Sequence, residues 1–239
     1  MELHCLPTRT GAAAENMALD FLLLQRYPHA AAFRFRHYEW RGPAFTFGFG
    51  QKLAWVREQL AAEDRPDLCR RPTGGGIVDH RHDWTYALVI PREHALWEAR
   101  ASQSYRLVHE CLARALQDLG QPAAVKVEGG PGGGGSAGPA GAGVCFQQAE
   151  LFDVVRPDTG EKIAGAAQKR NKRGLLLQGS VWKPAVGGID WDLLGGHFIA
   201  GLAEAAGVTL TPMPWPDLAE EEVQGLVDQY ASPEWMEYR

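Results

Sequence analysis

The residues best suited to chemistry lie in the stretch RRPTGGGIVDHRHDWTYAL, at positions 70–88. It contains an arginine pair, three consecutive glycines and two histidines separated by one residue. Three kinds of site use such residues: a backbone cradle for phosphate, a cluster of metal ligands, or a glycine-lined surface along which an elongated ligand lies. The residues around the stretch indicate which of these three kinds of site it forms.

Two of the three alternatives fit poorly. No Lys-Ser/Thr pair follows the glycines, as a phosphate-binding loop requires, and the apolar run at 84–91 predicts a strand where a dinucleotide fold would begin a helix. A metal site would use His80, His82 and Asp83, because two histidines one residue apart share a face of an extended segment. No further histidine-rich motif supplies another ligand, so exposed or hydrogen-bonding histidines are favoured over a metal site.

The remaining alternative is a glycine-lined backbone surface. Gly74, Gly75 and Gly76 remove every Cβ from the place where a flat or chain-like ligand would pass, and they expose N–H groups to an anionic or carbonyl oxygen. Arg70 and Arg71 add forked donors beside it. A tight turn with two surface arginines is the simpler structural alternative.

Hydrophobic periodicity predicts the elements that must position this stretch. Residues 15–27 and 101–120 have the helical period, the second ending at a glycine, whereas 31–40, 44–51 and 84–91 read as strands. Gly42-Pro43 separates the first two strands, which predicts a strand pair across a turn. The order of helix, strands, helix, strands and helices indicates an α+β domain with a mixed sheet flanked by helices.

Residues 128–143, EGGPGGGGSAGPAGAG, are too poor in side chains to join a core. Because the flanking segments are strand-like, we expect a flexible insert within a single domain spanning 1–239. After it, 145–156 and 161–182 read as strands joined by turns, with hairpin residues at 156–161. Residues 190–239 read as two helices joined by the proline-rich segment LTPMPWPDL.

Composition bounds the function. The 239 residues carry a net charge of −5 and a pI near 5.9, so no positive field favours nucleic acid. The N-terminal stretch lacks the basic start and long apolar run of a signal peptide, and no apolar run is long enough to span a bilayer, so we expect a cytoplasmic protein. Cys5, Cys69, Cys111 and Cys145 are widely spaced, which argues against a zinc site or a disulfide framework.

The glycine stretch resembles the Arg-Arg-x-Ser/Thr-Gly-Gly-Gly/Arg-x-Val-x-His signature of the lipoate–protein ligase and octanoyltransferase family. Four further stretches resemble motifs of that family in the same order: ENMALD (15–20), PAFTFGFGQ (43–51), EKIAGAAQKR (161–170) and YASPEW (230–235). The resemblance covers most of the chain except the glycine insert and parts of 184–215. It implies the mixed α+β catalytic domain shared with biotin ligases, although the biotin-ligase Gly-Arg-Gly-Arg signature is absent.

The resemblance also assigns roles. It implies that a lipoyl or octanoyl chain binds along the glycine loop, and that the substrate-binding residues are Arg70, Arg71, Thr73, Gly74, Gly75, Gly76, His80, Thr85, Tyr86, Gly165, Ala167 and Gln168. The segment GVCFQQAELFDVVRPDTGEKIAGAAQKR resembles the branch in which a cysteine carries the acyl group as a thioester. Cys145 then falls on the nucleophile and Lys162 on a cation that lowers the thiol pKa and donates to the acyl carbonyl.

The favoured function is therefore a protein octanoyltransferase of lipoate biosynthesis. It would take octanoyl from acyl carrier protein and pass it to a lysine of a lipoyl-carrier protein, either the glycine cleavage H protein or a lipoyl domain of the 2-oxoacid dehydrogenases, without cofactor or metal. One alternative is a lipoate–protein ligase that uses ATP and Mg²⁺, which commonly has an extra C-terminal domain for which this chain lacks room. Another is a non-catalytic member that binds acyl or lipoyl ligands.

Two features qualify this prediction. Gln178-Gly179-Ser180 stands where the family usually has His-Gly-Thr/Ser, so the role of that histidine is filled by Gln178 or lost. KRNKR, at 169–173, places four positive charges on an otherwise acidic chain. It is either a solvated hairpin or a docking patch for the acidic carrier proteins, whose complementary field would raise the association rate.

Overall fold

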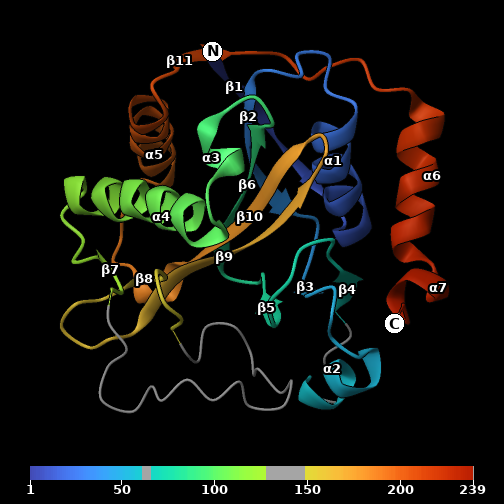
Figure 1. Cartoon of the computed structure of the whole chain (residues 1–239). Coiled ribbons are helices and arrows are strands. Elements are labelled where there is room, and N and C mark those ends of the chain that lie inside the picture. Colours follow the sequence, from blue (N-terminus) through green and yellow to red (C-terminus); the bar gives the residue numbers. More distant parts are fainter. Residues whose placement is uncertain (61–65, 128–148, 239) are drawn as a thin grey trace.

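An eight-stranded mixed sheet forms the centre of the protein (Figure 1). The computed structural model describes residues 1–60, 66–127 and 149–238. In sheet order the strands are β11 (Thr209–Pro212), β1 (Glu2–Gly11), β2 (Phe33–Trp40), β6 (Asp83–Pro91), β10 (Gly174–Trp182), β9 (Lys162–Asn171), β8 (Val154–Val155) and β7 (Ala124–Val125). Strand β1 is parallel to both its neighbours, whereas the pairs from β2 to β7 are antiparallel. The predicted α+β class with a mixed sheet is confirmed.

Strand β6 is buried along its whole length. It pairs with β10 from Asp83–Trp182 to Pro91–Gly174 and with β2 on its other side. Helices cover both faces of the sheet at this point, so both faces of β6 must be apolar and the strand reads as a continuous hydrophobic run. The predicted strand at 84–91 is confirmed.

Two helices cover one face of the sheet, α4 (Ala101–Asp118) and α5 (Trp191–Ala206), with the short α3 (Ala95–Glu98) nearby (Figure 1). The apolar side chains of α4 and α5 form the main core with β6 and β10, and Val108, Leu112 and Phe198 are completely buried. Helix α5 begins at Asp190, whose carboxylate accepts from two backbone N–H groups, and it ends at Gly207 in the left-handed conformation.

Helix α1 (Ala13–Gln25) covers the opposite face, and α6 (Glu220–Ala231) packs on its outer side (Figure 1). Asp20 of α1 and Arg36 of β2 form a completely buried ion pair of 2.6 Å. The short helix α7 (Pro233–Met236) ends the chain's described structure and begins at Ser232, whose hydroxyl accepts from the Trp235 N–H. The YASPEW segment, which resembles the family's closing helix, thus contains the end of α6 and the start of α7, divided at Ser232.

A second sheet of three strands lies beside the large one: β4 (Asp67–Arg70), β3 (Ala44–Phe47) and β5 (Ile77–Asp79). Helix α2 (Leu53–Gln59) packs against its apolar side chains. The prediction that 31–40 and 44–51 form a strand pair is wrong, because β2 pairs with β1 and β6, whereas β3 pairs with β4 and β5. Local periodicity identified both strands but not their partners, which are chosen by tertiary packing.

The sheet edge opposite β11 is built from two short strands. β7 and β8 pair with each other, and β8 continues to β9 through the predicted hairpin at 156–161. The insert at 128–143 lies outside the described residues. The tail differs from its prediction: β11 extends the sheet and α7 follows α6, while the 3-10 helix at Lys183–Ala185 precedes α5. Across the described part of the chain, no helix has the length and apolar character to cross a membrane.

Candidate active site

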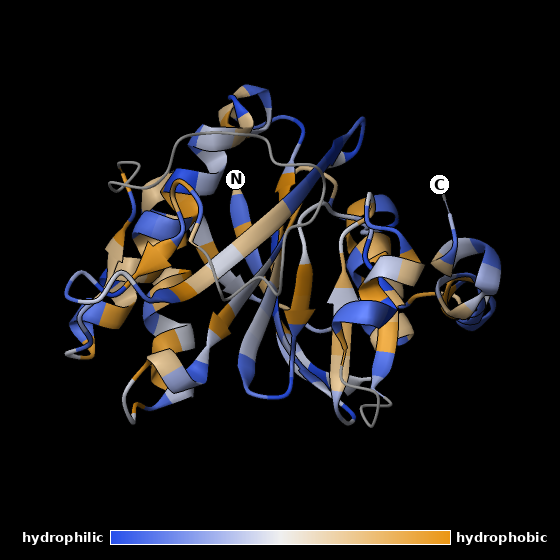
Figure 2. Ribbon diagram, turned by 90° about the horizontal axis from the view of Figure 1, so that it is seen from below, coloured by the Kyte–Doolittle hydropathy of each residue, from blue (hydrophilic) through white to orange (hydrophobic). Residues whose placement is uncertain are grey.

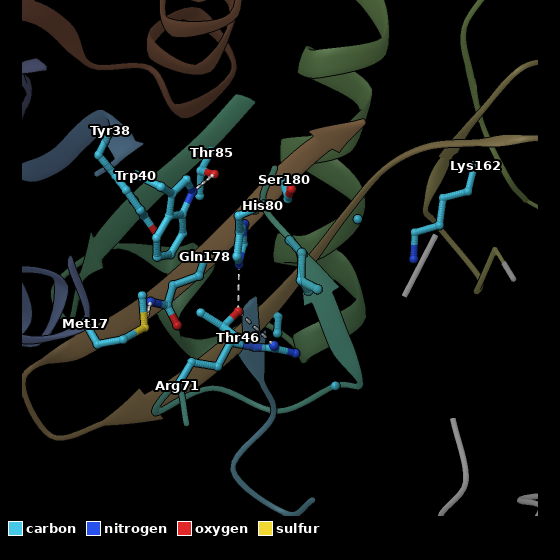
Figure 3. A pocket seen from close by; sticks show the side chains of 16 residues that line it. Met17, Tyr38, Trp40, Thr46, Arg71, His80, Thr85, Lys162, Gln178 and Ser180 are labelled. Atoms are coloured by element: carbon cyan, nitrogen blue, oxygen red, sulfur yellow. Dashed lines mark hydrogen bonds between the residues drawn. The ribbon is translucent and has the colours of Figure 1, made fainter. Parts of the chain in front are cut away.

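A pocket opens where the large sheet meets the small one (Figure 3). It holds about 530 Å³ of space between atoms, part of which is open to solvent. Its lining comes from α1, from strands β2, β3, β6, β9 and β10, and from the glycine stretch: Met17, Tyr38, Trp40, Thr46, Arg71, Gly75, Val78, His80, Thr85, Lys162, Gly165, Ala166, Ala167, Gln178, Gly179 and Ser180. In Figure 3, Lys162 stands on one side of the pocket, and Met17 and Tyr38 stand on the other.

A buried ion pair fixes the cation of this pocket. The Lys162 Nζ lies 2.8 Å from Asp153 Oδ2, and the two side chains are 8% and 1% exposed. A buried carboxylate needs a cation and a buried ammonium needs an anion, so each side chain compensates for the burial of the other. Lys162 is therefore presented to the pocket as a hydrogen-bond donor with a defined position.

The Asp153 carboxylate accepts further hydrogen bonds. Its Oδ1 accepts from the Tyr105 hydroxyl at 2.5 Å, and its Oδ2 accepts from the backbone N–H of Glu150 at 2.7 Å. The Tyr105 oxygen in turn accepts from the N–H of Ala166 in β9. Burial, reinforced by the Asp153 charge, raises the pKa of Tyr105 well above its usual range, so this hydroxyl remains a donor. Asp153 thus links α4, β9 and the loop before β8.

Gly165 makes room for the ion pair. A Cβ on Gly165 would lie 2.7 Å from Lys162 Cε and 2.8 Å from its Nζ, closer than van der Waals contact allows. Gly165 therefore leaves the space that the Lys162 side chain, from the same EKIAGAAQKR motif, occupies. Its neighbours Ala166 and Ala167 also have small side chains, which leave the pocket wall open beside the ammonium group.

His109 supports the loop that carries Asp153. Its Nδ1 bonds the carbonyl oxygen of Phe152 at 2.6 Å, and Phe152 adopts a left-handed conformation with φ of 70°. Burial lowers the pKa of His109 to about 4 from its usual 6.5. The folded protein therefore holds a neutral imidazole behind Asp153, in contact with the Tyr105 ring.

We expect this histidine to make stability depend on pH. Its folded pKa lies below its unfolded value, so the unfolded state binds more protons between these values and stability is lost as pH falls from about 6.5 to about 4. The loss from this group is about 3 kcal/mol. Urea unfolding across this pH range measures it, and His109→Gln should show a shallower dependence. Equal slopes in the two proteins would contradict the assignment.

Within the glycine stretch, Arg71 and the turn at Gly75 form a wall of the pocket. Arg71 donates from Nε and Nη2 to the Gly74 carbonyl at 3.0 and 2.6 Å, and from Nη1 to the Thr46 hydroxyl at 3.3 Å. Gly75 has φ of +90°, which favours glycine. Arg71 and Gly75 line the pocket, whereas Gly74 and Gly76 lie outside its lining.

Arg70 is placed elsewhere, outside the pocket lining. Its guanidinium donates to four backbone carbonyl groups, two in the loop after β3 (Phe49 and Gln51) and two in α7 (Trp235 and Met236). The indole N–H of Trp235 returns a bond to the Arg70 carbonyl. Arg70 therefore does not line this pocket beside Arg71, because its donors tie α7 to the small sheet.

This geometry predicts that Arg70→Lys lowers the free energy of unfolding by about 3 kcal/mol, because an ammonium cannot reproduce the forked set of bonds and leaves buried carbonyls unpaired. Chemical denaturation measures the change. If Arg70 bound substrate instead, the same substitution would raise KM and leave the unfolding free energy unchanged. Arg26→Lys, at an exposed ion pair with Glu222, is the matched control.

His80 and His82 do not share a face. A turn at residues 81 and 82 separates them, so His80 is buried and His82 is exposed. The His80 Nδ1 lies 2.7 Å from Asp83 Oδ2, its Nε2 lies 2.8 Å from the Thr46 hydroxyl, and its ring stacks on Trp40. The expected geometry of a His-x-His ligand pair is therefore wrong. In the described ranges no three His, Cys, Asp or Glu side chains gather in a way that could hold a metal ion.

Gln178 occupies the place of the family's usual histidine and lines the pocket. Its Oε1 accepts from the Thr73 hydroxyl at 2.7 Å, and its Nε2 donates to Asp20 Oδ2 at 2.6 Å. Thr73 lies outside the pocket lining and contributes by orienting this amide. Gln178 thus connects the glycine stretch to the buried Asp20–Arg36 pair of α1 and β2.

Strand alternation separates two pairs of predicted site residues. Thr85 lines the pocket, but Tyr86 faces the opposite core and packs against Phe35. Likewise Ala167 lines the pocket, whereas Gln168 faces α4, bonding the Ala101 carbonyl and the Ser104 hydroxyl. Successive side chains of a strand point to opposite faces, so Tyr86 and Gln168 turn their side chains away from the pocket that Thr85 and Ala167 line.

Cys145, the predicted nucleophile, lies outside the described residues. The other three thiols are free, and burial raises the pKa of each, to about 11 for Cys111. None of these three lines the pocket. They fit the expectation of small hydrophobic side chains rather than activated thiolates.

The structure therefore brings together seven predicted site residues: Arg71, Gly75, His80, Thr85, Lys162, Gly165 and Ala167. Sequence reasoning missed Asp153, Tyr105 and Thr46. Asp153 stands in an apolar context, FDVV, where a buried carboxylate needs a partner, and that was the available signal. Thr46 alternates with the buried Phe45 and Phe47, which placed it on the other face of β3 without showing what lies there.

Comparison with known structures defines the class of protein. Lipoate-protein ligase A bound with ATP superposes with a TM-score of 0.74, covering 99% of this chain and 98% of that one at 18% identity. A bipartite lipoate protein ligase from Thermoplasma acidophilum superposes with a TM-score of 0.72, covering 100% and 97% of the two chains, also at 18% identity. The chain therefore has the fold of a lipoate protein ligase catalytic domain, as predicted.

Sequence comparison defines the family. Residues 12–182 match the model of the lipoyl protein ligase A/B catalytic domain. The chain belongs to this family. The octanoyltransferase LipM of Exiguobacterium sp. is 26% identical over 270 residues, covering 98% of this chain and 97% of the relative. That of Oceanobacillus iheyensis is 35% identical over 170 residues, covering 70% and 58% of the two chains.

Proposed function

We propose that this protein is an octanoyltransferase that transfers an octanoyl group to a lysine of a lipoyl-carrier protein. The observation that carries the proposal is the Lys162 ammonium, held by Asp153 on one side of a pocket that has Met17, Tyr38 and Trp40 on its other side. A medium-length acyl chain fits this arrangement, with its carbonyl oxygen near the Lys162 ammonium and its hydrocarbon tail toward Met17 and Tyr38. The relatives named octanoyltransferase support the same assignment.

The proposed reaction begins with octanoyl carried as a thioester on acyl carrier protein. The Cys145 thiolate attacks the acyl carbonyl, its C–S bond forms, the carrier's C–S bond breaks, and the carrier's sulfur takes up the proton that the Cys145 thiol had lost. This exchange of one thioester for another is nearly neutral in free energy, so it needs no ATP. Lys162 donates a hydrogen bond to the carbonyl oxygen as negative charge develops on it, and its fixed position removes the cost of orienting it.

In the second step, a lysine amine of the lipoyl-carrier protein attacks the enzyme thioester. A C–N bond forms, the C–S bond breaks, and the amine nitrogen loses a proton. Glycine cleavage H protein and the lipoyl domains of 2-oxoacid dehydrogenases are the proposed acceptors. The Thermoplasma ligase is described together with an E2 lipoyl domain, which supports an acceptor of this kind.

The hairpin between β9 and β10 is the proposed docking site for these acidic carriers. Lys172 and Arg173 at its tip are exposed, whereas Lys169 lies over the Phe49 ring and Arg170 bonds the Ala99 carbonyl. Figure 2 shows this strand pair ending in strongly hydrophilic residues. The two tip cations are thus the ones free to meet a partner's carboxylates.

Reversing these two charges should weaken carrier docking. We expect Lys172→Glu with Arg173→Glu to lower kcat/KM for the carrier proteins about tenfold at low salt, mainly through slower association, with a smaller effect at high salt. Steady-state kinetics at two ionic strengths measure this. Arg100→Glu with Arg114→Glu, on the exposed surface of α4 and the residue before it, makes the same change in net charge and is the control.

The second candidate function is an ATP-dependent lipoate–protein ligase. Arg71 and Lys162 are the described pocket cations that would meet phosphate. Magnesium fits less well: no carboxylate appears among the described residues of the lining, and both oxygens of Asp153 bind Lys162, Tyr105 and Glu150. The described donor set does not match the oxygen-rich site that Mg²⁺ requires, so we derive no step through it.

A two-substrate assay separates the candidates. The transferase predicts octanoylation of apo lipoyl-carrier protein by octanoyl-acyl carrier protein without ATP. Lipoylation from free lipoate that requires ATP would support the ligase. Binding of octanoate or lipoate with neither activity would support a non-catalytic member and would contradict the proposal.

A further inference from the structure

A second groove lies between α2 and the end of the described chain, beside the small sheet (Figure 1). It holds about 1520 Å³ of space between atoms, part of which is open to solvent. It is lined by the loop before α2, by α2 itself, by Arg70 and by the two residues that follow α7. Met236 of α7 packs against the apolar side chains that α2 buries, so the two helices are held together on either side of the groove.

The groove carries positive charge although the chain as a whole is acidic. Lys52 and Arg57 are exposed in its lining, and neither forms an ion pair with a carboxylate of the described ranges. Arg70 is buried and its guanidinium donates to backbone carbonyls, so no described carboxylate neutralises its charge. Glu237 is the one carboxylate among the described lining residues. Three cations against one carboxylate favour an anionic ligand.

Aromatic rings lie beside these cations. The ring centroids of Phe49 and Tyr238 are 5.1 Å apart, and the Trp235 ring lies 5.8 Å from that of Phe49. Lys169 places its Nζ 5.0 Å from the centroid of the Phe49 ring. Because Lys169 belongs to the KRNKR stretch of the β9–β10 hairpin, the groove adjoins the proposed docking site for the carriers.

A single wall of backbone separates this groove from the active-site pocket. Gln51 lines the groove, and its Nε2 donates at 3.3 Å to the carbonyl of Gly75, which lines the pocket. A Cβ on Gly75 would lie 3.8 Å from the Cβ of Ala167 in β9. Ala167 is about 7 Å along the strand from Gly165, against which the Lys162 ammonium packs. An extended ligand with its carbonyl at Lys162 therefore reaches the groove by passing the glycine turn.

We propose that this groove binds the phosphate of a phosphopantetheine thioester, the group that presents octanoyl to the enzyme. This inference rests on the proposed octanoyltransferase function. Acyl carrier proteins hold acyl chains as thioesters at the end of such an arm, and coenzyme A ends in the same arm. Lys52 and Arg57 bind the phosphate oxygens, and the rings of Phe49 and Tyr238 contact the arm. The thioester then lies in the pocket, at Lys162.

Two small donors isolate the contribution of the phosphate. Octanoyl-phosphopantetheine carries it without a protein, and octanoyl-pantetheine lacks it. The rate constant for octanoyl loading is measured by intact mass at low donor concentration. Wild-type enzyme should prefer the phosphorylated donor about fivefold, the scale of two exposed charge contacts. Lys52→Gln with Arg57→Gln should abolish this preference by slowing loading from the phosphorylated donor.

A matched control and a stability measurement accompany this test. Arg100→Gln with Arg114→Gln removes the same net charge from the exposed surface at α4 and should keep the fivefold preference. Lys52 and Arg57 are exposed and unpaired in the described structure, so their double variant should unfold in urea at the wild-type concentration.

Two larger donors distinguish the sources of the arm. A loss in the groove variant with octanoyl-acyl carrier protein assigns the site to the carrier's arm, whereas a loss with octanoyl-coenzyme A alone assigns it to the coenzyme. Equal wild-type loading from the two small donors overturns the phosphate site and leaves the transferase standing. So does a loss with the carrier protein that octanoyl-phosphopantetheine does not reproduce, because the two cations then meet the carrier's protein surface. Wild-type enzyme that forms no octanoyl thioester from any donor overturns both.

Discussion

Replacing Lys162 by Met is expected to lower the rate of octanoyl transfer about 100- to 1000-fold. Methionine has a similar length but supplies no hydrogen bond to the acyl oxygen, and losing one such donor from a preorganised site has an effect of this size. The substitution also leaves the Asp153 carboxylate buried without its cation, which should lower the free energy of unfolding by about 3 kcal/mol. Single-turnover kinetics and urea unfolding measure the two effects.

A double variant separates catalysis from stability. In Lys162→Met with Asp153→Asn, the uncompensated charge is gone while the amide still meets Tyr105, so stability should largely return. The transfer rate should remain low, because the ammonium is still missing. Recovery of the rate in the double variant would show that Lys162 acts only through folding, and would remove it from the mechanism.

Gly48→Ala is expected to disrupt the glycine wall of the pocket. A Cβ at this position would lie 2.0 Å from the carbonyl oxygen of Gly75 and 2.8 Å from the carbonyl carbon of Gly74, both rigid backbone atoms. The N–H of Gly48 also bonds the Gly76 carbonyl at 3.1 Å, so the two loops cannot separate without losing that bond. We expect a loss of about 3 kcal/mol in unfolding free energy, together with weaker acyl binding.

Gly50 supplies the matched control. It lies two residues along the same segment, and a Cβ there would meet nothing within 4 Å. Gly50→Ala should therefore leave unfolding within about 0.5 kcal/mol of the wild type. If both variants melt alike in thermal unfolding, the close approach of Gly48 to the glycine stretch is not what stabilises this wall.

The sequence predicted much of this fold because its helices and strands are strongly periodic. The helices at 15–27 and 101–120 and the strand at 84–91 are present with small changes at their ends. The pairing of strands was harder to predict: β3 follows β2 after three residues but joins another sheet. Strand β11 was missed in a proline-rich segment, because its pairing with β1 depends on a contact distant in sequence.

The site was predicted in part, for two physical reasons. Motif resemblance selects runs of residues, but a strand turns alternate side chains to opposite faces, so Thr85 and Ala167 reach the pocket while Tyr86 and Gln168 do not. Arg70 belongs to the same motif as Arg71, yet four backbone carbonyls occupy its guanidinium group. Asp153, by contrast, is defined by its buried ion pair with Lys162, which only the folded chain brings together.

In the proposed mechanism, the protein carries an octanoyl group as a thioester on Cys145. Intact-mass measurement after incubation with octanoyl-acyl carrier protein, without ATP, tests it most directly. We expect a mass gain of one octanoyl group in the wild type, no gain in Cys145→Ala, and an unchanged gain in the control Cys5→Ala. Lipoate transfer that requires ATP and survives Cys145→Ala would contradict it.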